Sequence, residues 1–203
     1  MRQSVRLGIF GGTFDPPHIG HQILAAEAYD QLSLDRVLWV LTPNPPHKQD
    51  QVVSSLKKRL QMVEAVISDN DFFELSRVEI DRPPPHYAVD TVKLLAQQHP
   101  NAELYYLVGG DSLIDIHTWH IPDEFVLACD GIGIMCRPGE EIELRNLETQ
   151  TPGISEKLYF IDAPLLEISS SKIRKRVRRG ETYRYYVPPK IYRLIHEQRL
   201  YID

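Results

Sequence analysis

Short runs of apolar residues alternate along this chain with segments whose apolar residues recur at helical spacing. The first run, 5–10, ends at Gly11-Gly12, and the run 36–41 is almost wholly apolar, as expected of a strand covered on both faces. Further strands are expected at 72–75, 78–80, 104–108, 132–135 and 158–161, and helices at 20–32, 56–67, 88–98, from 169 onward, and 188–198. The residues expected to face the core in the first two helices are Ile23, Leu24, Ala26, Ala28, Leu60, Val63, Ala65 and Ile67. The alternation predicts an α/β fold, with a Rossmann-like, doubly wound, mainly parallel sheet and helices on both faces.

Length and composition favour one ordinary globular domain. With 203 residues, the chain can bury one substantial core, so a single domain is expected over 1–203, with a C-terminal helical part over about 169–203. The net charge of −5 gives no overall attraction to nucleic acid or membrane, and no apolar run approaches the ~18 residues of a membrane span. Cys129 and Cys136 are too far apart for a CxxC pair and are expected to be reduced thiols in a cytoplasmic protein. The polar stretch 140–153 is expected to be irregular and mobile.

Three polar segments follow predicted strands and are expected to meet at one edge of the sheet. Gly11-Gly12 follows the first strand, "GGDS" (109–112) follows a middle strand, and "ISSS" (168–171) follows the last. In a doubly wound sheet ligands bind at the carboxyl ends of the strands. The sequence therefore predicts a single ligand site built from these three segments.

The segment "GIFGGTFDPPHIGH" (8–21) combines a glycine turn with two histidines at the start of a helix. Glycine lets a backbone turn tightly and approach a ligand, and a helix N-terminus favours phosphate. His18 and His21, three apart, would share one face of the first helical turn and could donate hydrogen bonds to anionic oxygens. A purely structural turn is an alternative, because neither GxGxxG nor GxxxxGK[ST] is present. The two histidines could also be half of a metal site, although the HExxH pattern of zinc enzymes is absent.

The segment "ISSSKIRKRVRR" (168–179) places positive charge where a helix disfavours it. Ser169–Ser171 are candidate N-caps, so Lys172 and Arg174 fall in the first turn, against the helix dipole. A triphosphate bound at this N-terminus would make the arrangement favourable. The later positive side chains, Lys175, Arg176, Arg178 and Arg179, are expected to form a solvated cationic face, with an RNA-binding patch as the alternative.

Three further residues have both a structural and a functional interpretation. Lys48 lies at the end of a proline-stiffened loop and is either solvated or a ligand for an anion. Asp111 could bind a ribose hydroxyl, help recruit a metal, or cap the next helix. Trp119 belongs either to the core or to a platform on which a ring stacks.

With these residues in view, "GGTFDPPHIGH" resembles the GGTFDPxHxGH signature of the bacterial nicotinate-mononucleotide adenylyltransferases, within the HxGH nucleotidyltransferase superfamily, and "ISSSKIR" resembles its second motif, ISSTxIR. The likeness continues through "NPPHK", "DRPPPHYAVDT", "GGDS", "TWH" and "RPG", over nearly the whole chain. It implies adenylyl transfer from ATP to nicotinate mononucleotide, a step of NAD biosynthesis that yields nicotinate adenine dinucleotide and pyrophosphate. It also implies Mg²⁺ carried by the ATP phosphates, no metal held tightly by the protein, and a monomer or small homo-oligomer.

The resemblance also implies roles for individual residues. His18, His21 and Arg174 would stabilise charge on the transferring and leaving phosphates, because the attacking phosphate is already largely dianionic and needs no general base. The other residues implied for ATP are Gly11, Gly12, Thr13, Phe14, Lys48, Asp111, Ser169 and Ser170. Those implied for nicotinate mononucleotide are Asn44, Tyr87, Ala88, Trp119 and His120, with backbone N–H groups near Ala88 and His120 on the carboxylate. His86 and Ala88 stand where the family commonly has hydroxyl residues.

Two alternative functions remain open from the sequence. On the same scaffold the chain could transfer an adenylyl group to phosphopantetheine or a cytidylyl group to another acceptor. A non-catalytic nucleotide- or RNA-binding module would instead use the basic helix and bind RNA with a steep salt dependence. Binding alone does not require both His18 and His21, which favours an enzyme.

Overall fold

A computed structural model describes residues 4–44, 53–135, 142–164 and 166–202 of the chain. In this part of the chain six strands form one sheet in the order β3-β2-β1-β4-β5-β6, and every adjacent pair is parallel. The strands are β1 (Val5–Gly12), β2 (Arg36–Leu41), β3 (Phe73–Ser76), β4 (Ala102–Gly109), β5 (Gly131–Met135) and β6 (Leu158–Phe160). The order reverses between β1 and β4, as in doubly wound nucleotide-binding sheets, so the predicted fold class is confirmed.

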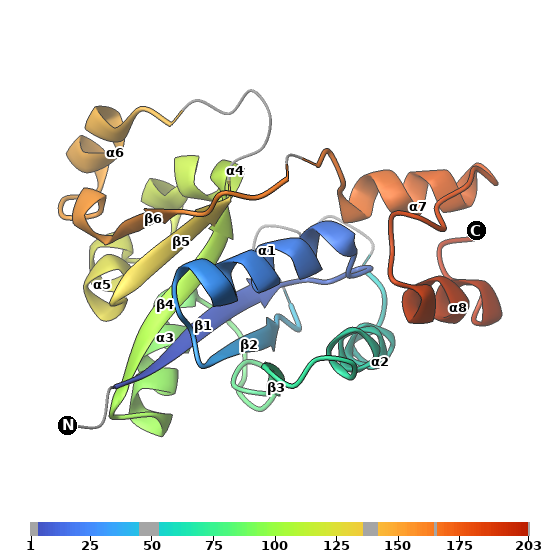
Figure 1. Cartoon of the computed structure of the whole chain (residues 1–203), viewed down its shortest axis with the longest axis horizontal. Helices are drawn as coiled ribbons and strands as arrows, with labels where there is room; N and C mark the ends of the chain where they lie inside the picture. The colour runs from blue at the N-terminus through green and yellow to red at the C-terminus, as the bar shows by residue number, and fades with distance from the viewer. Residues whose placement is uncertain (1–3, 45–52, 136–141, 165, 203) are drawn as a thin grey trace.

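Helices cover both faces of this sheet (Figure 1). They are α1 (Ile19–Gln31), α2 (Leu56–Ile67), α3 (Ala88–Gln98), α4 (Gly110–Ile114), α5 (Pro122–Ala128), α6 (Leu144–Gln150), α7 (Ser170–Arg178) and α8 (Pro189–Glu197), with 3₁₀ turns at Ile116–Thr118 and Ser155–Lys157. The buried side chains form two clusters, one shared with α1, α2, α7 and α8 and the other with α3, α4, α5 and α6. These two sets of helices are the two outer layers.

The side-chain alternation of the strands explains the two clusters. In β1 and β2, Phe10 and Trp39 belong to the first cluster, whereas their neighbours Ile9 and Leu38 belong to the second. All four side chains are at most 4% exposed, so both strands are buried on both faces. This is why the sequence shows nearly continuous apolar runs instead of alternation.

Several predicted boundaries were wrong. Strand β1 continues through Gly11 and Gly12 instead of ending before them. Residues 78–80 form a turn, not a strand: Val78 is buried there by side-chain packing, without a partner strand. Helix α6 lies within the stretch predicted to be irregular, where it is held by the buried side chain of Leu147. The short helices α4 and α5 were not predicted, because five and seven residues show too little periodicity.

The predicted core faces of the first two helices were only partly right. In α1 the buried residues include Leu24 and Ala28, but Ala25 is buried instead of Ala26. In α2 the prediction of Val63 holds, whereas Arg59 is buried and Leu60, Ala65 and Ile67 are only partly covered. The spacing of apolar residues cannot predict an arginine inside a core, because the hydrogen bonds that hold it there come from distant segments.

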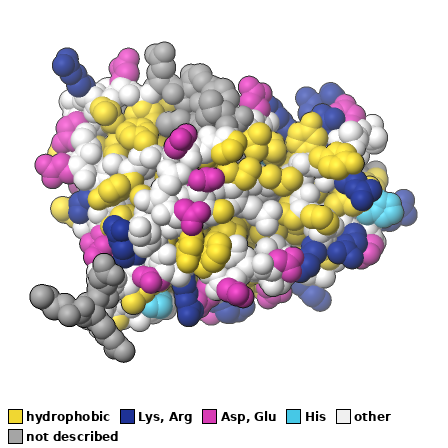
Figure 2. Space-filling model, in the orientation of Figure 1, with side chains coloured by type: hydrophobic (Ala, Val, Ile, Leu, Met, Phe, Trp, Pro, Cys, Tyr) yellow, Lys and Arg dark blue, Asp and Glu magenta, His cyan; other side chains and the backbone are white. Residues whose placement is uncertain are grey.

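The C-terminal helices form one end of the molecule, where α8 packs against α2 (Figure 1). Ten of the 23 lysine and arginine residues of the chain fall in 169–203. Positive side chains accordingly gather at this end of the surface, beside an otherwise mixed face (Figure 2). Within the described residues, no helix is both long enough and apolar enough to cross a bilayer.

Candidate active site

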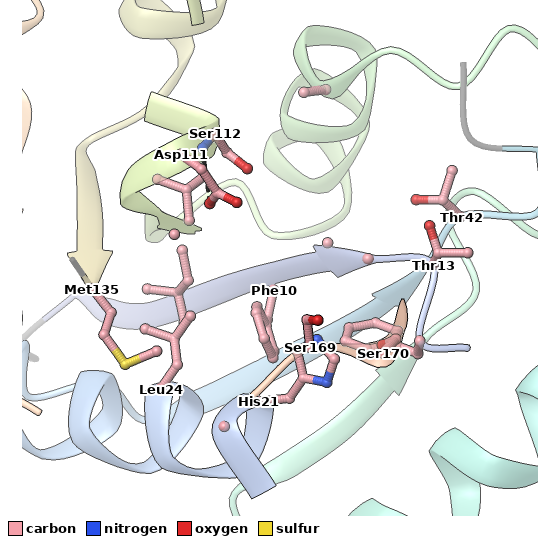
Figure 3. A pocket seen from close by; sticks show the side chains of 18 of the residues that line it. Phe10, Thr13, His21, Leu24, Thr42, Asp111, Ser112, Met135, Ser169 and Ser170 are labelled. Atoms are coloured by element: carbon pink, nitrogen blue, oxygen red, sulfur yellow. Dashed lines mark hydrogen bonds between the residues drawn. The ribbon is translucent and has the colours of Figure 1, made fainter. Parts of the chain in front are cut away.

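A cavity of about 950 Å³ opens at the carboxyl edge of the sheet. Its walls come from the ends of β1, β4 and β5, from Thr42 directly after β2, from the first turns of α1, α4 and α7, and from the segments 86–88 and 118–121. In Figure 3, Asp111 and Met135 lie to one side, Thr13 and Thr42 to the other, and His21, Ser169 and Ser170 between them. Segments more than 150 residues apart in the sequence therefore share one site, as predicted from the topology.

Most of the residues singled out in the sequence line this cavity. They are Gly11, Gly12, Thr13, Phe14, His18, His21, Tyr87, Ala88, Asp111, Trp119, His120, Ser169, Ser170 and Arg174. Asn44 is exposed at the end of a described segment and is not part of the lining. Lys48 lies outside the described residues. The contacts predicted for these two side chains stay predictions.

The two glycines do not make the turn that the sequence suggested. Gly11 and Gly12 are the last residues of β1, and neither has a positive φ. The left-handed residue is Phe14, with φ 48°. The glycines are needed for space, because a Cβ at Gly11 would lie 2.7 Å from the Tyr106 hydroxyl oxygen and one at Gly12 would lie 2.8 Å from Phe14 Cζ. They let two aromatic rings pack directly against the backbone under the cavity.

His18 and His21 cap helix α1 reciprocally. The backbone N–H of His21 donates to His18 Nδ1 at 3.3 Å, and the backbone N–H of His18 donates to His21 Nδ1 at 3.1 Å. The rings stack with centroids 3.6 Å apart, and Gly20 leaves room for the His18 ring. Because each Nδ1 accepts a hydrogen bond, the proton of each neutral imidazole lies on Nε2. The pair therefore presents two Nε2–H donors whose orientation is fixed by the helix terminus.

The cap limits how a metal ion could bind this pair. A metal bound through Nδ1 of either ring would displace a backbone hydrogen bond of the cap. Among the described residues, no three histidine, cysteine, aspartate or glutamate side chains gather closely enough to hold a metal ion.

Asp15 ties the first motif to the C-terminal helices. It is 3% exposed, and its backbone oxygen accepts a hydrogen bond from Arg174 Nη1 at 2.7 Å. Its carboxylate oxygens accept from the Tyr201 hydroxyl at 2.7 Å and from the Ser54 N–H at 3.0 Å. The Arg174 guanidinium is thereby fixed in the cavity wall by the segment that precedes α1.

Helix α7 begins as predicted. Ser169 is its N-cap and accepts from the Lys172 N–H at 3.3 Å, while the Ser170 hydroxyl donates to the Pro16 carbonyl at 2.8 Å. The two positive residues of the first turn separate, however. Arg174 lines the cavity, whereas Lys172 is largely exposed and pairs with Glu167. Lys172 was also expected to bind an anion at this helix start, and that prediction was wrong because its side chain does not line the cavity.

The opposite end of the cavity is aromatic. Trp119 packs edge-on against Phe125 and Tyr106, at ring-centroid distances of 5.1 and 6.0 Å, and it also lines the cavity. The core interpretation is therefore confirmed, and the platform interpretation stays a prediction for a residue that lines the cavity. Tyr87 and His120, from two separate loops, stack with centroids 4.0 Å apart.

Asp111 does not cap a helix in the expected way. Helix α4 begins at Gly110 with Gly109 at the N-cap, so Asp111 lies inside the first turn and accepts from the Ser112 N–H at 3.1 Å. Its side chain is exposed in the cavity wall. The capping alternative was wrong, and the ribose and metal alternatives stay predictions.

Arg59 is a supporting residue that the sequence did not reveal. Its side chain is 2% exposed and donates to the carbonyl oxygens of Ser54, Thr13, Thr42 and Pro43 at 2.6 to 3.1 Å. Burial lowers the pKa of this guanidinium, and the nearby Asp15 carboxylate opposes that effect. One side chain thus joins the segment that follows β1, the end of β2 and the start of α2.

Glu79 and His86, both buried, also line the cavity near its aromatic end. Burial raises the pKa of the Glu79 carboxyl, although hydrogen bonds from Thr91 and Thr42 hold it down in part. Burial and the positive charge of Arg82 lower the pKa of His86, which keeps its ring neutral. Arg82 in turn donates to the carbonyls of Pro85 and Tyr87, so this network shapes the 85–88 loop.

Comparison with known proteins places the site in a family. A family model described as cytidylyltransferase-like matches residues 9–176, which include both motifs. The chain belongs to the cytidylyltransferase-like family. Within it, the chain is 40% identical over 197 residues to a Thermomicrobium roseum protein named "Probable nicotinate-nucleotide adenylyltransferase", covering 97% of this chain and 91% of that protein. A protein of the same name from Exiguobacterium sibiricum is 39% identical, covering 97% and 99%.

A solved structure shows the same fold. Plasmodium falciparum nicotinic acid mononucleotide adenylyltransferase complexed with NaAD matches with a TM-score of 0.81 and 22% identity, over 97% of both chains. The resemblance found in the sequence is thus confirmed at the level of family by the relatives, and at the level of fold by this structure.

Proposed function

We propose that this chain transfers the adenylyl group of ATP to nicotinate mononucleotide, giving nicotinate adenine dinucleotide and pyrophosphate. The observation that carries the proposal is the reciprocal cap of His18 and His21, which presents two Nε2–H donors in the same cavity as Arg174. The relatives of this chain are named for this activity, and they share nearly its whole length.

Positioned donors suit this reaction. The mononucleotide phosphate attacks the α-phosphorus of ATP, and pyrophosphate leaves in line. The second pKa of a phosphate monoester is about 6, so the nucleophile is already ionised and no general base is required. The remaining task is to hold the two phosphates in line and to stabilise charge that develops on the transferring oxygens. The Nε2–H groups of His18 and His21 supply that stabilisation, and Arg174 adds a positive charge in the same cavity.

The triphosphate would bind between the two motifs. Helix α7 is nine residues long, and its N-terminus and the side chains of Ser169 and Ser170 lie in the cavity wall beside Arg174. The contact predicted for Lys48 would add a further positive charge. Mg²⁺ carried by the ATP phosphates would neutralise charge on the leaving pyrophosphate. The lining fits such an ion, because Mg²⁺ that is bound to phosphates keeps several waters. Asp111 and the hydroxyl groups of the cavity could bind these waters without surrounding the ion completely.

The two ends of the cavity match the two bases. Leu24, Met135 and Ile168 give one end an apolar lining that suits the flat adenine ring. Trp119 lies at the other end, where it can stack on the pyridine ring while backbone N–H groups near Ala88 and His120 read the carboxylate. Backbone donors bind an acid better than an amide, which favours nicotinate over nicotinamide mononucleotide.

A pyrophosphate-release assay tests this function. The purified chain is incubated with Mg²⁺ and either ATP or CTP, against nicotinate mononucleotide, nicotinamide mononucleotide and phosphopantetheine. Fastest release with ATP and nicotinate mononucleotide is expected, and fastest release with CTP or with phosphopantetheine would overturn the assignment. His18→Ala is expected to lower turnover by roughly 10²–10³, the usual effect of losing a transition-state donor. A folded variant with wild-type turnover would remove His18 from the mechanism.

A further inference from the structure

The C-terminal tail folds back onto the first motif. Leu200 is 3% exposed, and the residues on either side of it, Arg199 and Tyr201, have left-handed backbones with φ of 48° and 64°. Residues other than glycine adopt this conformation only where the surrounding structure holds them. The tail is therefore an ordered part of the fold, and it turns the Tyr201 side chain inward.

The Tyr201 hydroxyl reaches the phosphate end of the site from this tail. It donates to Asp15 Oδ1 at 2.7 Å and lies 3.9 Å from Met62 Sδ. Burial first, and then the charge of Asp15, raise the pKa of this phenol, so the hydroxyl keeps its proton and remains a donor. Tyr201 does not itself line the cavity.

Asp15 transmits this contact to the site residues on both sides. Asp15 lies three residues before His18. Its other carboxylate oxygen accepts a hydrogen bond from the Ser54 N–H, and its backbone oxygen accepts one from Arg174 Nη1. The same short segment therefore sets where α1 begins and where the guanidinium points. Arg174 comes from helix α7, whereas the hydroxyl that donates to the Asp15 carboxylate belongs to Tyr201, 186 residues away in the sequence.

We infer that Tyr201 is a positioning residue for the phosphate end of the site: through Asp15 it sets the separation between the His18–His21 pair and Arg174. Its kinetic consequence rests on the proposed function, whereas its effect on ATP binding rests only on the part of that function that places ATP in this cavity. Loss of the hydroxyl frees one carboxylate oxygen of Asp15, so the segment and the guanidinium can shift without loss of any group that touches a substrate.

Tyr201→Phe tests this inference because it keeps the ring and its packing and removes only the hydroxyl. The matched control is Tyr192→Phe in α8, whose ring packs in the same core cluster but whose hydroxyl makes no hydrogen bond within the described residues. For Tyr201→Phe, kcat/KM for ATP is expected to fall roughly 10- to 100-fold, the size produced by a displacement of about 1 Å, with KM for the mononucleotide changed less than twofold. The affinity for ATP alone, from titration calorimetry, is expected to fall about 5-fold.

Each outcome decides for or against the positioning role. The positioning role is supported if Tyr192→Phe keeps the wild-type kinetic constants while Tyr201→Phe loses kcat/KM and affinity only for ATP. A Tyr201→Phe variant within twofold of the control overturns it, and so does a loss of activity that only follows the folded fraction measured by circular dichroism. If Tyr201→Phe is less stable, the assay is run at a temperature at which it is fully folded. If the wild-type chain releases no pyrophosphate with any acceptor, the proposed function fails, and the ATP titration alone decides the role of Tyr201.

Discussion

Replacing Arg59 removes a side chain that holds three segments of the chain together. Its guanidinium donates to four carbonyl oxygens, at 2.9 Å to Ser54, 3.1 Å to Thr13, 2.8 Å to Thr42 and 2.6 Å to Pro43. A planar fork with five N–H groups can serve acceptors on several sides at once. Lysine carries the same charge but places its three donors on one atom, so it can serve only some of these carbonyls.

The expected losses follow from the number of bonds. The four acceptor residues are half-buried, so each carbonyl that loses its donor costs about 1 kcal/mol, at the lower end of the range for an unsatisfied group. Arg59→Met loses all four donors and is expected to lower the free energy of unfolding by about 4 kcal/mol, in line with the cost of leaving one partner of a buried charge pair alone. Arg59→Lys keeps the charge near Asp15 and about half of the bonds, so a loss of about 2 kcal/mol is expected.

Urea unfolding followed by circular dichroism measures both values. The matched control is Arg77, half-exposed and paired with Asp81 across one helical turn's spacing, where the same two substitutions are expected to cost less than about 0.5 kcal/mol. An Arg59→Lys variant within 0.5 kcal/mol of the wild type would refute the reasoning, because it would show that charge alone, and not the geometry of the fork, holds the segments.

Three further changes have expected outcomes. Burial raises the pKa of Glu79, so the folded protein loses stability as the pH rises through that raised value. The Glu79→Gln variant is therefore expected to lose less free energy of unfolding between pH 5 and 8 than the wild type. Equal losses in urea titrations would contradict this. Gly12→Ala would press a Cβ to 2.8 Å from the Phe14 ring and is expected to cost about 1–3 kcal/mol, whereas an unchanged urea midpoint would mean that the ring moves freely. Chelation of Mg²⁺ with EDTA is expected to stop pyrophosphate release and its re-addition to restore it; release that persists in EDTA would argue against metal-bound ATP as the substrate.

The sequence by itself determined the layers of the fold and the edge where the site forms. Strands buried on both faces must be apolar along their whole length, and helices that cover them must repeat their apolar residues every three or four positions, so both signals are local. The start of α7 was predicted for the same reason, since a serine N-cap acts on the first turn of its own helix. Once the strands are parallel, their carboxyl ends meet, and the residues that follow them come together.

Only the tertiary structure decided how the site is held. Arg59 interrupts the apolar pattern of α2, and its acceptors are spread over residues that precede it by 5 to 46 positions. Tyr201 and Arg174 reach Asp15 from 186 and 159 residues away. No local pattern announces such bonds, because they depend on which backbone groups the finished fold leaves buried and without partners. For the same reason the glycine pair of β1 predicts a turn from the sequence alone, because the aromatic rings that leave no room for a Cβ there come close only in the packed fold.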